Sequence, residues 1–412
     1  MNLAEFKWHA IRGHGECVVE LLKRETTDYS QFIQHLVLNN YAFLIDENRE
    51  SYVHKLAEFY NQNEYYIDLI IKKLSKTKLE NYFTFGYLIN VLYFFLKNCS
   101  CTYKARLFNM LKRKLNKSTF TFNENKSVNE MVSLLLDLFY DKEEVKLIIN
   151  NYYKKFKDSN LELSTIEYSY GIRFDKLINN IRTIDYSIFE NYDTFLACIS
   201  NEKTFEFILP IVSIYMSRNV LNMLVDDMAN KRFSLSDAYK VAEILYVSKK
   251  ITSSYSKKIL SCIGKYDNKT DEYLFKTLSV LKSKSLKDYG YSLLSTKNKA
   301  YGVAMLINNY ESSDFDILNK KIKQLKINYS NSDDWFFVEE QLIRYFNKKN
   351  IDIKMLDLIY YFLKNGLSSF SRYSLVKILI KFNYLDLDEL QILSYDANYN
   401  TRKLVTSYLK KH

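Results

Sequence analysis

His9, His14 and Cys17 are the residues near the start of the sequence whose types suggest chemistry, because imidazole and thiolate groups bind zinc. Structural zinc sites usually combine two pairs of closely spaced ligands. The sequence offers no second cluster that would supply the fourth ligand. We therefore expect no metal and no cofactor.

The same segment places Gly13 and Gly15 on either side of His14, with Trp8 and Arg12 before them. Glycine lets a backbone approach a phosphate closely. However, no strand pattern precedes these glycines, and no Lys-Ser/Thr pair follows them. We interpret the segment as a terminal cap whose glycines allow close helix packing. The alternative is that Trp8, Arg12 and His14 contact an anion or a peptide.

A long stretch without acidic residues, 81–123, carries seven basic side chains. On a helix over 103–117, Arg106, Arg113 and Lys117 would lie beside an apolar stripe. Such a run of charge is usually a solvated helix face, and contact with nucleic-acid phosphates is the alternative. The candidate phosphate-binding residues are Lys104, Arg106, Lys112, Arg113, Lys114 and Lys117.

Three pairs of neighbouring acids, at 226–227, 333–334 and 339–340, could suggest acid–base chemistry. Adjacent residues on a helix point about 100° apart, so the two carboxylates of a pair do not face one substrate. We expect surface acids and assign no catalytic residue. The sequence also lacks the motifs of P-loop, Rossmann, HExxH, GxSxG and kinase sites. An enzyme is therefore the less favoured class.

Helices are the elements predicted to position these residues. The 412 residues include one proline and eight glycines, too few for the turns of β-sandwiches or repeated βα units. Apolar side chains recur at i, i+3, i+4 and i+7, as in Leu375, Ile378, Leu379 and Phe382. Short polar breaks with Ser, Asp or Asn provide N-caps. The sequence predicts an all-α protein with little or no β structure.

Helix pairs recur in the C-terminal third of the sequence. Helices aligned on Lys299, Trp335, Arg372 and Arg402 start 30–37 residues apart, and an apolar helix lies between successive ones. Two helices in each period of this length are typical of an α-solenoid.

The last unit, 395–409, resembles the second half of a HEAT repeat. The resemblance implies that Asp396 and Arg402 lie in the turn between two helices, where such residues bond the backbone or each other between repeats. The expected fold is therefore an α–α superhelix of HEAT-like helix hairpins.

A polar stretch near 157–164 suggests an N-terminal helical region, 1–160, followed by HEAT-like repeats over 161–412. One continuous solenoid over 1–412 is equally consistent with the sequence. Five scattered cysteines favour reduced thiols and a cytoplasmic location. The most apolar segment, Tyr82–Leu96, is shorter than the about 20 residues of a membrane span. We expect it to be a core helix, and we expect no membrane contact.

The net charge of +11 has two explanations, an A/T-rich coding sequence or an anionic partner. Our preferred hypothesis is a non-enzymatic interaction scaffold that binds another protein on the concave face of the solenoid. The alternative is a nucleic-acid-binding HEAT-like protein that uses the basic patch at 104–117. In that alternative the chain would resemble HEAT-like DNA glycosylases in architecture.

Overall fold

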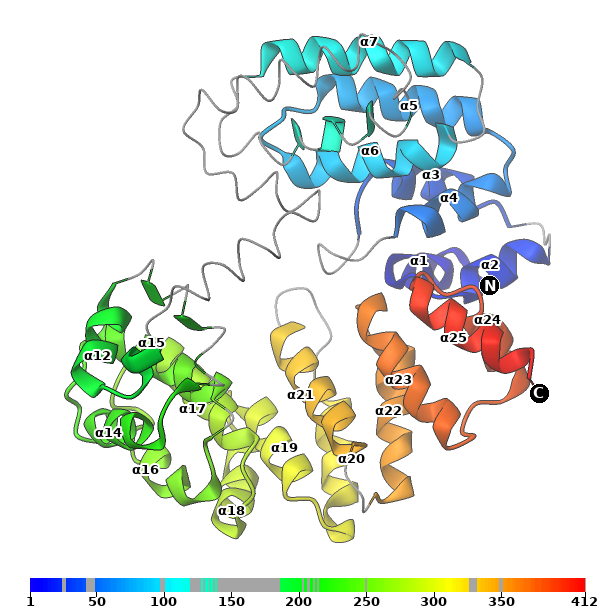
Figure 1. Cartoon of the computed structure of the whole chain (residues 1–412). Coiled ribbons are helices and arrows are strands. Elements are labelled where there is room, and N and C mark those ends of the chain that lie inside the picture. Colours follow the sequence, from blue (N-terminus) through cyan, green and yellow to red (C-terminus); the bar gives the residue numbers. More distant parts are fainter. Residues whose placement is uncertain are drawn as a thin grey trace. The chain divides into compact units, whose positions relative to one another are not determined.

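The computed structural model describes residues 1–23, 27–41, 49–96, 101–118, 186–201, 215–248, 250–325, 332–347 and 351–411, with isolated positions within 127–138 and 204–212. Within these ranges every regular element is a helix, and no β-strand occurs. The prediction of an all-α protein is confirmed (Figure 1).

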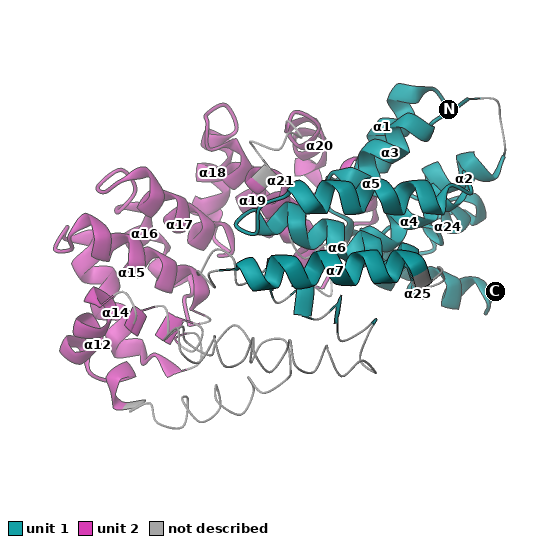
Figure 2. Cartoon of the chain, turned by 90° about the horizontal axis from the view of Figure 1, so that it is seen from above, with its two compact units in different colours: residues 1–179, 366–412 teal, residues 180–365 magenta. Residues whose placement is uncertain are grey.

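The chain forms two compact units (Figure 2). Unit 1 consists of residues 1–179 and 366–412, and unit 2 consists of residues 180–365. This division differs from the predicted boundary near residue 160, which lies outside the described residues. The segment after residue 366 belongs with the N-terminal segment because it packs on the turn after α1 (Leu3–Arg12).

Unit 1 is built around α6, the apolar helix expected to lie in the core. Its residues Phe85, Leu88, Val91 and Leu92 are fully buried. The labelled helices of unit 1 are α1 (Leu3–Arg12), α2 (Glu16–Leu22), α3 (Ser30–Leu38), α4 (Glu50–Glu58), α5 (Asn63–Lys76), α6 (Tyr82–Leu96), α7 (Cys101–Lys117), α23 (Ser369–Lys381), α24 (Leu387–Leu393) and α25 (Tyr399–Leu409).

The two chain segments of unit 1 meet at the turn between α1 and α2, which lies beside α24 and α25 in Figure 1. The backbone N–H of Ala397 donates to the carbonyl of Gly13 at 2.8 Å. Arg372 of α23 donates to the carbonyls of Arg12 and Gly13 at 2.6 and 3.1 Å. These carbonyls end α1 and would otherwise lack a partner, so the C-terminal segment caps the first helix.

Unit 2 is a succession of helices in which alternate members form one layer. Within this layer α15 packs on α17, α17 on α19, and α19 on α21. The labelled helices of unit 2 are α12 (Tyr192–Ser200), α14 (Arg218–Ala229), α15 (Leu235–Val247), α16 (Ser256–Leu260), α17 (Asn268–Ser279), α18 (Lys284–Leu293), α19 (Lys299–Asn308), α20 (Phe315–Lys323), α21 (Ser332–Tyr345) and α22 (Leu356–Asn365).

Local sequence signals explain where several of these helices begin. Asp267 accepts a hydrogen bond from the Thr270 N–H at 2.8 Å and caps α17. Ser234 and Ser217 cap α15 and α14 in the same way. No helix among the described residues is long and apolar enough to cross a membrane.

Candidate functional site

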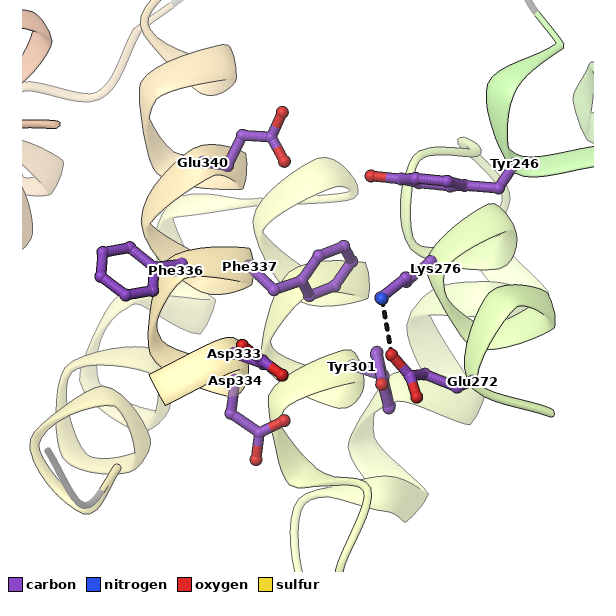
Figure 3. A pocket seen from close by; sticks show the side chains of 9 residues that line it. All are labelled: Tyr246, Glu272, Lys276, Tyr301, Asp333, Asp334, Phe336, Phe337 and Glu340. Carbon is purple, nitrogen blue, oxygen red and sulfur yellow. Dashed lines mark hydrogen bonds and ion pairs between the residues drawn. The ribbon is translucent and has the colours of Figure 1, made fainter. Parts of the chain in front are cut away.

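A pocket of about 250 Å³ lies on the layer of unit 2 formed by α15, α17, α19 and α21 (Figure 3). Four carboxylates line it, together with one lysine and four aromatic rings. The lining residues are Tyr246 of α15, Glu272 and Lys276 of α17, Tyr301 of α19, and Asp333, Asp334, Phe336, Phe337 and Glu340 of α21.

The position of α19 in this pocket depends on two glycines. A Cβ atom at Gly302 would lie 2.7 Å from the carbonyl oxygen of Gly290, and one at Gly290 would lie 3.1 Å from the carbonyl oxygen of Gly302. Only glycine permits this close approach of α18 and α19. Tyr301 is next to Gly302, and its ring stacks on Phe275 at a centroid distance of 5.2 Å. The glycine contact therefore helps to fix the ring that lines the pocket.

The negative charge of the pocket is only partly neutralised. Lys276 pairs with Glu272 at 2.6 Å, and Arg344 pairs with Glu340 at 2.6 Å. Asp333 and Asp334 form no ion pair with any described residue, and Lys299 acts on Asp334 only through its field. Two carboxylates are thus available for an incoming cation.

The pKa values of the pocket residues reflect the same environment. Burial raises the pKa of Asp334, and the carboxylates of Asp333 and Glu272 add to this rise. Burial also raises the pKa of Tyr301, with contributions from Glu272, Asp334 and Asp333. A bound cation would relieve this crowding of negative charge. Chemically, the pocket is suited to an organic cation held between carboxylates and aromatic faces.

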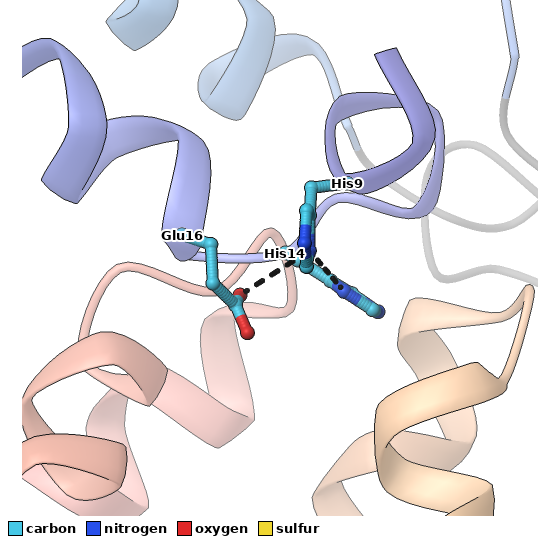
Figure 4. A group of neighbouring side chains, drawn as sticks. All are labelled: His9, His14 and Glu16. Atoms are coloured by element: carbon cyan, nitrogen blue, oxygen red, sulfur yellow. Dashed lines mark hydrogen bonds and ion pairs between the residues drawn. The ribbon is translucent and has the colours of Figure 1, made fainter. Parts of the chain in front are cut away.

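A second cluster lies in unit 1, where His9, His14 and Glu16 face one another (Figure 4). The Nδ1 atoms of His9 and His14 are 3.1 Å apart, and His9 Nδ1 is 3.9 Å from Glu16 Oε2. Burial holds the pKa of His14 well below its usual value, and Arg372 and His9 lower it further. His14 is therefore a neutral imidazole at neutral pH.

Cys17 does not join this cluster, although the sequence spacing grouped it with the histidines. Its thiol is fully buried and donates to the carbonyl of Phe6 at 3.4 Å. Burial raises the pKa of the thiol, so a thiolate is not formed there. Glu16, which sequence reasoning passed over, occupies the place expected for Cys17.

Of the three predicted N-terminal contact residues, His14 is buried, while Trp8 and Arg12 are partly exposed. The Arg12 guanidinium lies over the Trp8 ring, 4.1 Å from its centroid, and donates to the Trp8 carbonyl at 3.1 Å. Trp8 and Arg12 thus contact each other, and His14 faces inward to His9.

The predicted basic patch lies on α7, where several side chains interact within unit 1. Arg106 pairs with Asp68 of α5 at 2.5 Å, and Lys114 donates to the carbonyl of Thr77 at 2.8 Å. Arg113 bonds the carbonyl of Asn109 in its own helix. Lys117 is exposed, and Lys104 and Lys112 are partly exposed.

Asp396 lies in the turn between α24 and α25, as expected, whereas Arg402 lies inside α25, near its N-terminal end. Arg402 donates to the carbonyls of Asp396 and Ala397 at 2.6 and 2.8 Å. Asp396 is completely buried and pairs with Arg372 of α23 at 2.7 Å. Arg372 was aligned as a repeat position in the sequence but was not expected to be a site residue.

Comparison with known proteins gives no relative on which to base a function. No protein-family model matches the chain, and neither a curated protein nor a solved structure is significantly similar to it.

Proposed function

We propose that this chain is a non-enzymatic binding protein that holds a basic side chain of a protein partner in the pocket of unit 2. The observation that carries the proposal is that Asp333 and Asp334, which have no ion-pair partner among the described residues, share one pocket with the aromatic rings of Tyr246, Tyr301 and Phe337. A lysine or arginine side chain combines the charge and the apolar stem that such a pocket accommodates.

The layer of helices that carries the pocket supports the same kind of function. Four successive layer helices, α15, α17, α19 and α21, each contribute lining residues. A HEAT-like solenoid presents such a layer as a long binding surface, since each repeat packs only on its neighbours. We extend the proposal to that architecture and to a cytoplasmic location, which the free thiols of Cys17, Cys198 and Cys262 support.

The test uses peptides of one sequence that carry lysine, arginine or glutamine at the central position. We expect the lysine and arginine peptides to bind in a fluorescence-anisotropy titration and the glutamine peptide to bind at least about tenfold more weakly, because only a cation gains the carboxylate and ring contacts. The combined variant Asp333→Asn and Asp334→Asn should remove this preference, and added salt should weaken binding by the wild type.

A matched control changes two exposed aspartates of the same unit, Asp193→Asn and Asp316→Asn. Like the pocket pair, both lie in the first turn of a helix, so the total change in charge is the same and also occurs at helix N-termini. Equal binding of the lysine and glutamine peptides, or equal loss in the control and pocket variants, would refute the proposal.

A further inference from the structure

Three side chains with metal-binding atoms converge between α1 and α2 of unit 1 (Figure 4). His9 lies in the last turn of α1, His14 in the short connection, and Glu16 is the first residue of α2. Their ligand atoms all lie within 4.8 Å of one another. His9 and Glu16 are 22% and 19% exposed, so an ion can reach the cluster from solvent.

The separations of these atoms fit one metal centre. Two ligand atoms of a tetrahedral zinc centre, each about 2.0 Å from the metal, lie about 3.3 Å apart. The Nδ1–Nδ1 separation of 3.1 Å is close to that value, whereas His9 Nδ1 is 3.9 Å from Glu16 Oε2, so the glutamate side chain has to rotate inward to complete the centre. Although the sequence led us to expect no metal, we propose that His9, His14 and Glu16 bind one zinc ion through the two Nδ1 atoms and the carboxylate.

The backbone around His14 is held in place from several sides. Gly13 has a left-handed backbone with φ of 72°, and a Cβ atom there would lie 2.5 Å from the Cβ of Ala397. A Cβ atom at Gly15 would lie 1.9 Å from the carbonyl oxygen of Ile392. The Tyr52 hydroxyl donates to the His14 carbonyl at 2.7 Å. The ligand-bearing loop is therefore fixed before an ion arrives, which lowers the cost of binding.

Three guanidinium groups near His14 oppose the binding of a positively charged zinc ion. Each of them already has hydrogen-bond or ion-pair acceptors. Arg372 pairs with the buried carboxylate of Asp396. Arg49 donates to the carbonyls of Ile11 and Leu367. Arg12 donates to the carbonyl of Trp8 and lies over its ring. These positive charges weaken zinc binding, and the negative charge of Glu16 offsets part of this effect.

Two histidines and one glutamate leave the fourth position of a tetrahedral zinc centre for water. The ligand set is that of an open site and not of a closed structural site. Oxygen and imidazole ligands also accept cobalt(II), whose visible spectrum reports the geometry around the metal. Cobalt therefore serves as a second probe at the same residues.

The test titrates the untagged, metal-free full chain with zinc in competition with a chromogenic chelator, and repeats the titration with cobalt. We expect one zinc per chain, a tetrahedral cobalt spectrum, and a zinc-dependent rise in the melting temperature. His9→Gln and Glu16→Gln should each weaken zinc binding by at least about tenfold. Both side chains are partly exposed, so these variants should remain folded, as circular dichroism would check.

The matched control is His54→Gln, since His54 also pairs with a glutamate, Glu58, at 3.7 Å. It should bind zinc as the wild type does. Failure of the wild type to bind one zinc, or binding that persists in both His9→Gln and Glu16→Gln, would overturn the proposal. Binding lost only in His54→Gln would overturn it as well, because it would assign the metal to another site.

Discussion

Replacing Asp396 with asparagine removes the charge that balances Arg372 inside unit 1. Arg372 and Asp396 are 1% and 0% exposed, and their side chains are 2.7 Å apart. Arg372 also donates to the carbonyls of Ser368, Arg12 and Gly13. The variant leaves a guanidinium ion buried with only carbonyl dipoles around it.

The expected loss of stability follows from this burial. Breaking a buried ion pair by removing one partner costs about 3–5 kcal/mol. The three remaining carbonyl acceptors stabilise part of the orphaned charge, so we expect a value near the lower end, about 3 kcal/mol. With a urea m-value of about 1–3 kcal/mol per molar, the unfolding midpoint of unit 1 should fall by roughly 1–3 M.

The assay uses the two tryptophans, because each unit contains one. Trp8 lies in α1 of unit 1, and Trp335 lies in α21 of unit 2. In a Trp335→Phe background, tryptophan fluorescence reports the unfolding of unit 1 alone. In a Trp8→Phe background it reports unit 2, where Asp396→Asn should change nothing.

Two further variants test whether the loss of stability in Asp396→Asn comes from the unpaired charge of Arg372. Arg402→Gln removes hydrogen bonds to the Asp396 and Ala397 carbonyls from a partly exposed side chain, and it should cost only about 1 kcal/mol. Arg372→Met combined with Asp396→Leu should cost less than the sum of the two single changes, because no charge is left unpaired. A midpoint for Asp396→Asn within about 0.3 M of the wild type, or strict additivity in the double variant, would refute the reasoning.

Two other predictions concern unit 1. Burial raises the pKa of Glu50 to about 7, with a further contribution from Glu130, so the folded unit holds a proton that the unfolded chain releases above about pH 4.5. The free energy of unfolding should therefore fall as pH rises from about 4.5 to 7. In urea unfolding, Glu50→Gln should be more stable than the wild type by about 3 kcal/mol at pH 8 and similar to it at pH 5. A stability advantage of Glu50→Gln that does not change with pH would contradict this prediction. On α7, the combined variant Arg106→Glu, Arg113→Glu and Lys117→Glu should leave nucleic-acid binding at physiological salt unchanged. Arg106 already pairs with Asp68, and we expect little binding by the wild type. A submicromolar complex of the wild type that this variant destroys in mobility-shift titrations would favour the nucleic-acid hypothesis.

The sequence predicted the helices well because their signals are local. The apolar helices expected between the helices aligned on Lys299, Trp335, Arg372 and Arg402 correspond to α20, α22 and α24. Apolar periodicity and capping residues such as Asp267 act within one or two turns, so they can be read without knowing the fold. The contact between Arg372 and Gly13 spans almost the whole chain, and no local pattern indicates it.

The pocket of unit 2 could not be predicted from neighbouring residues. Asp333 and Asp334 are neighbours on one helix and point in different directions from its axis, so the helix alone indicates no shared pocket. In the structure, side chains from α17 and α19 complete the surroundings, and both aspartates line the same pocket. The N-terminal cluster was missed for a similar reason, since spacing alone favoured Cys17 although its thiol turns inward toward Phe6.

The chain as a whole is positively charged while its pocket is negatively charged, and this difference constrains the charge of the proposed partner. The chain carries a net charge of +11, whereas the pocket has four carboxylates and one lysine. Charges farther away than about 8–10 Å are largely screened at physiological salt, so a side chain in the pocket responds mainly to the local carboxylates. The net positive charge of the chain nevertheless opposes the approach of a strongly basic partner, most strongly at low salt. The proposed partner segment should therefore present one or two basic side chains within a neutral or acidic sequence, and acidic residues flanking the central lysine of the test peptide should strengthen its binding.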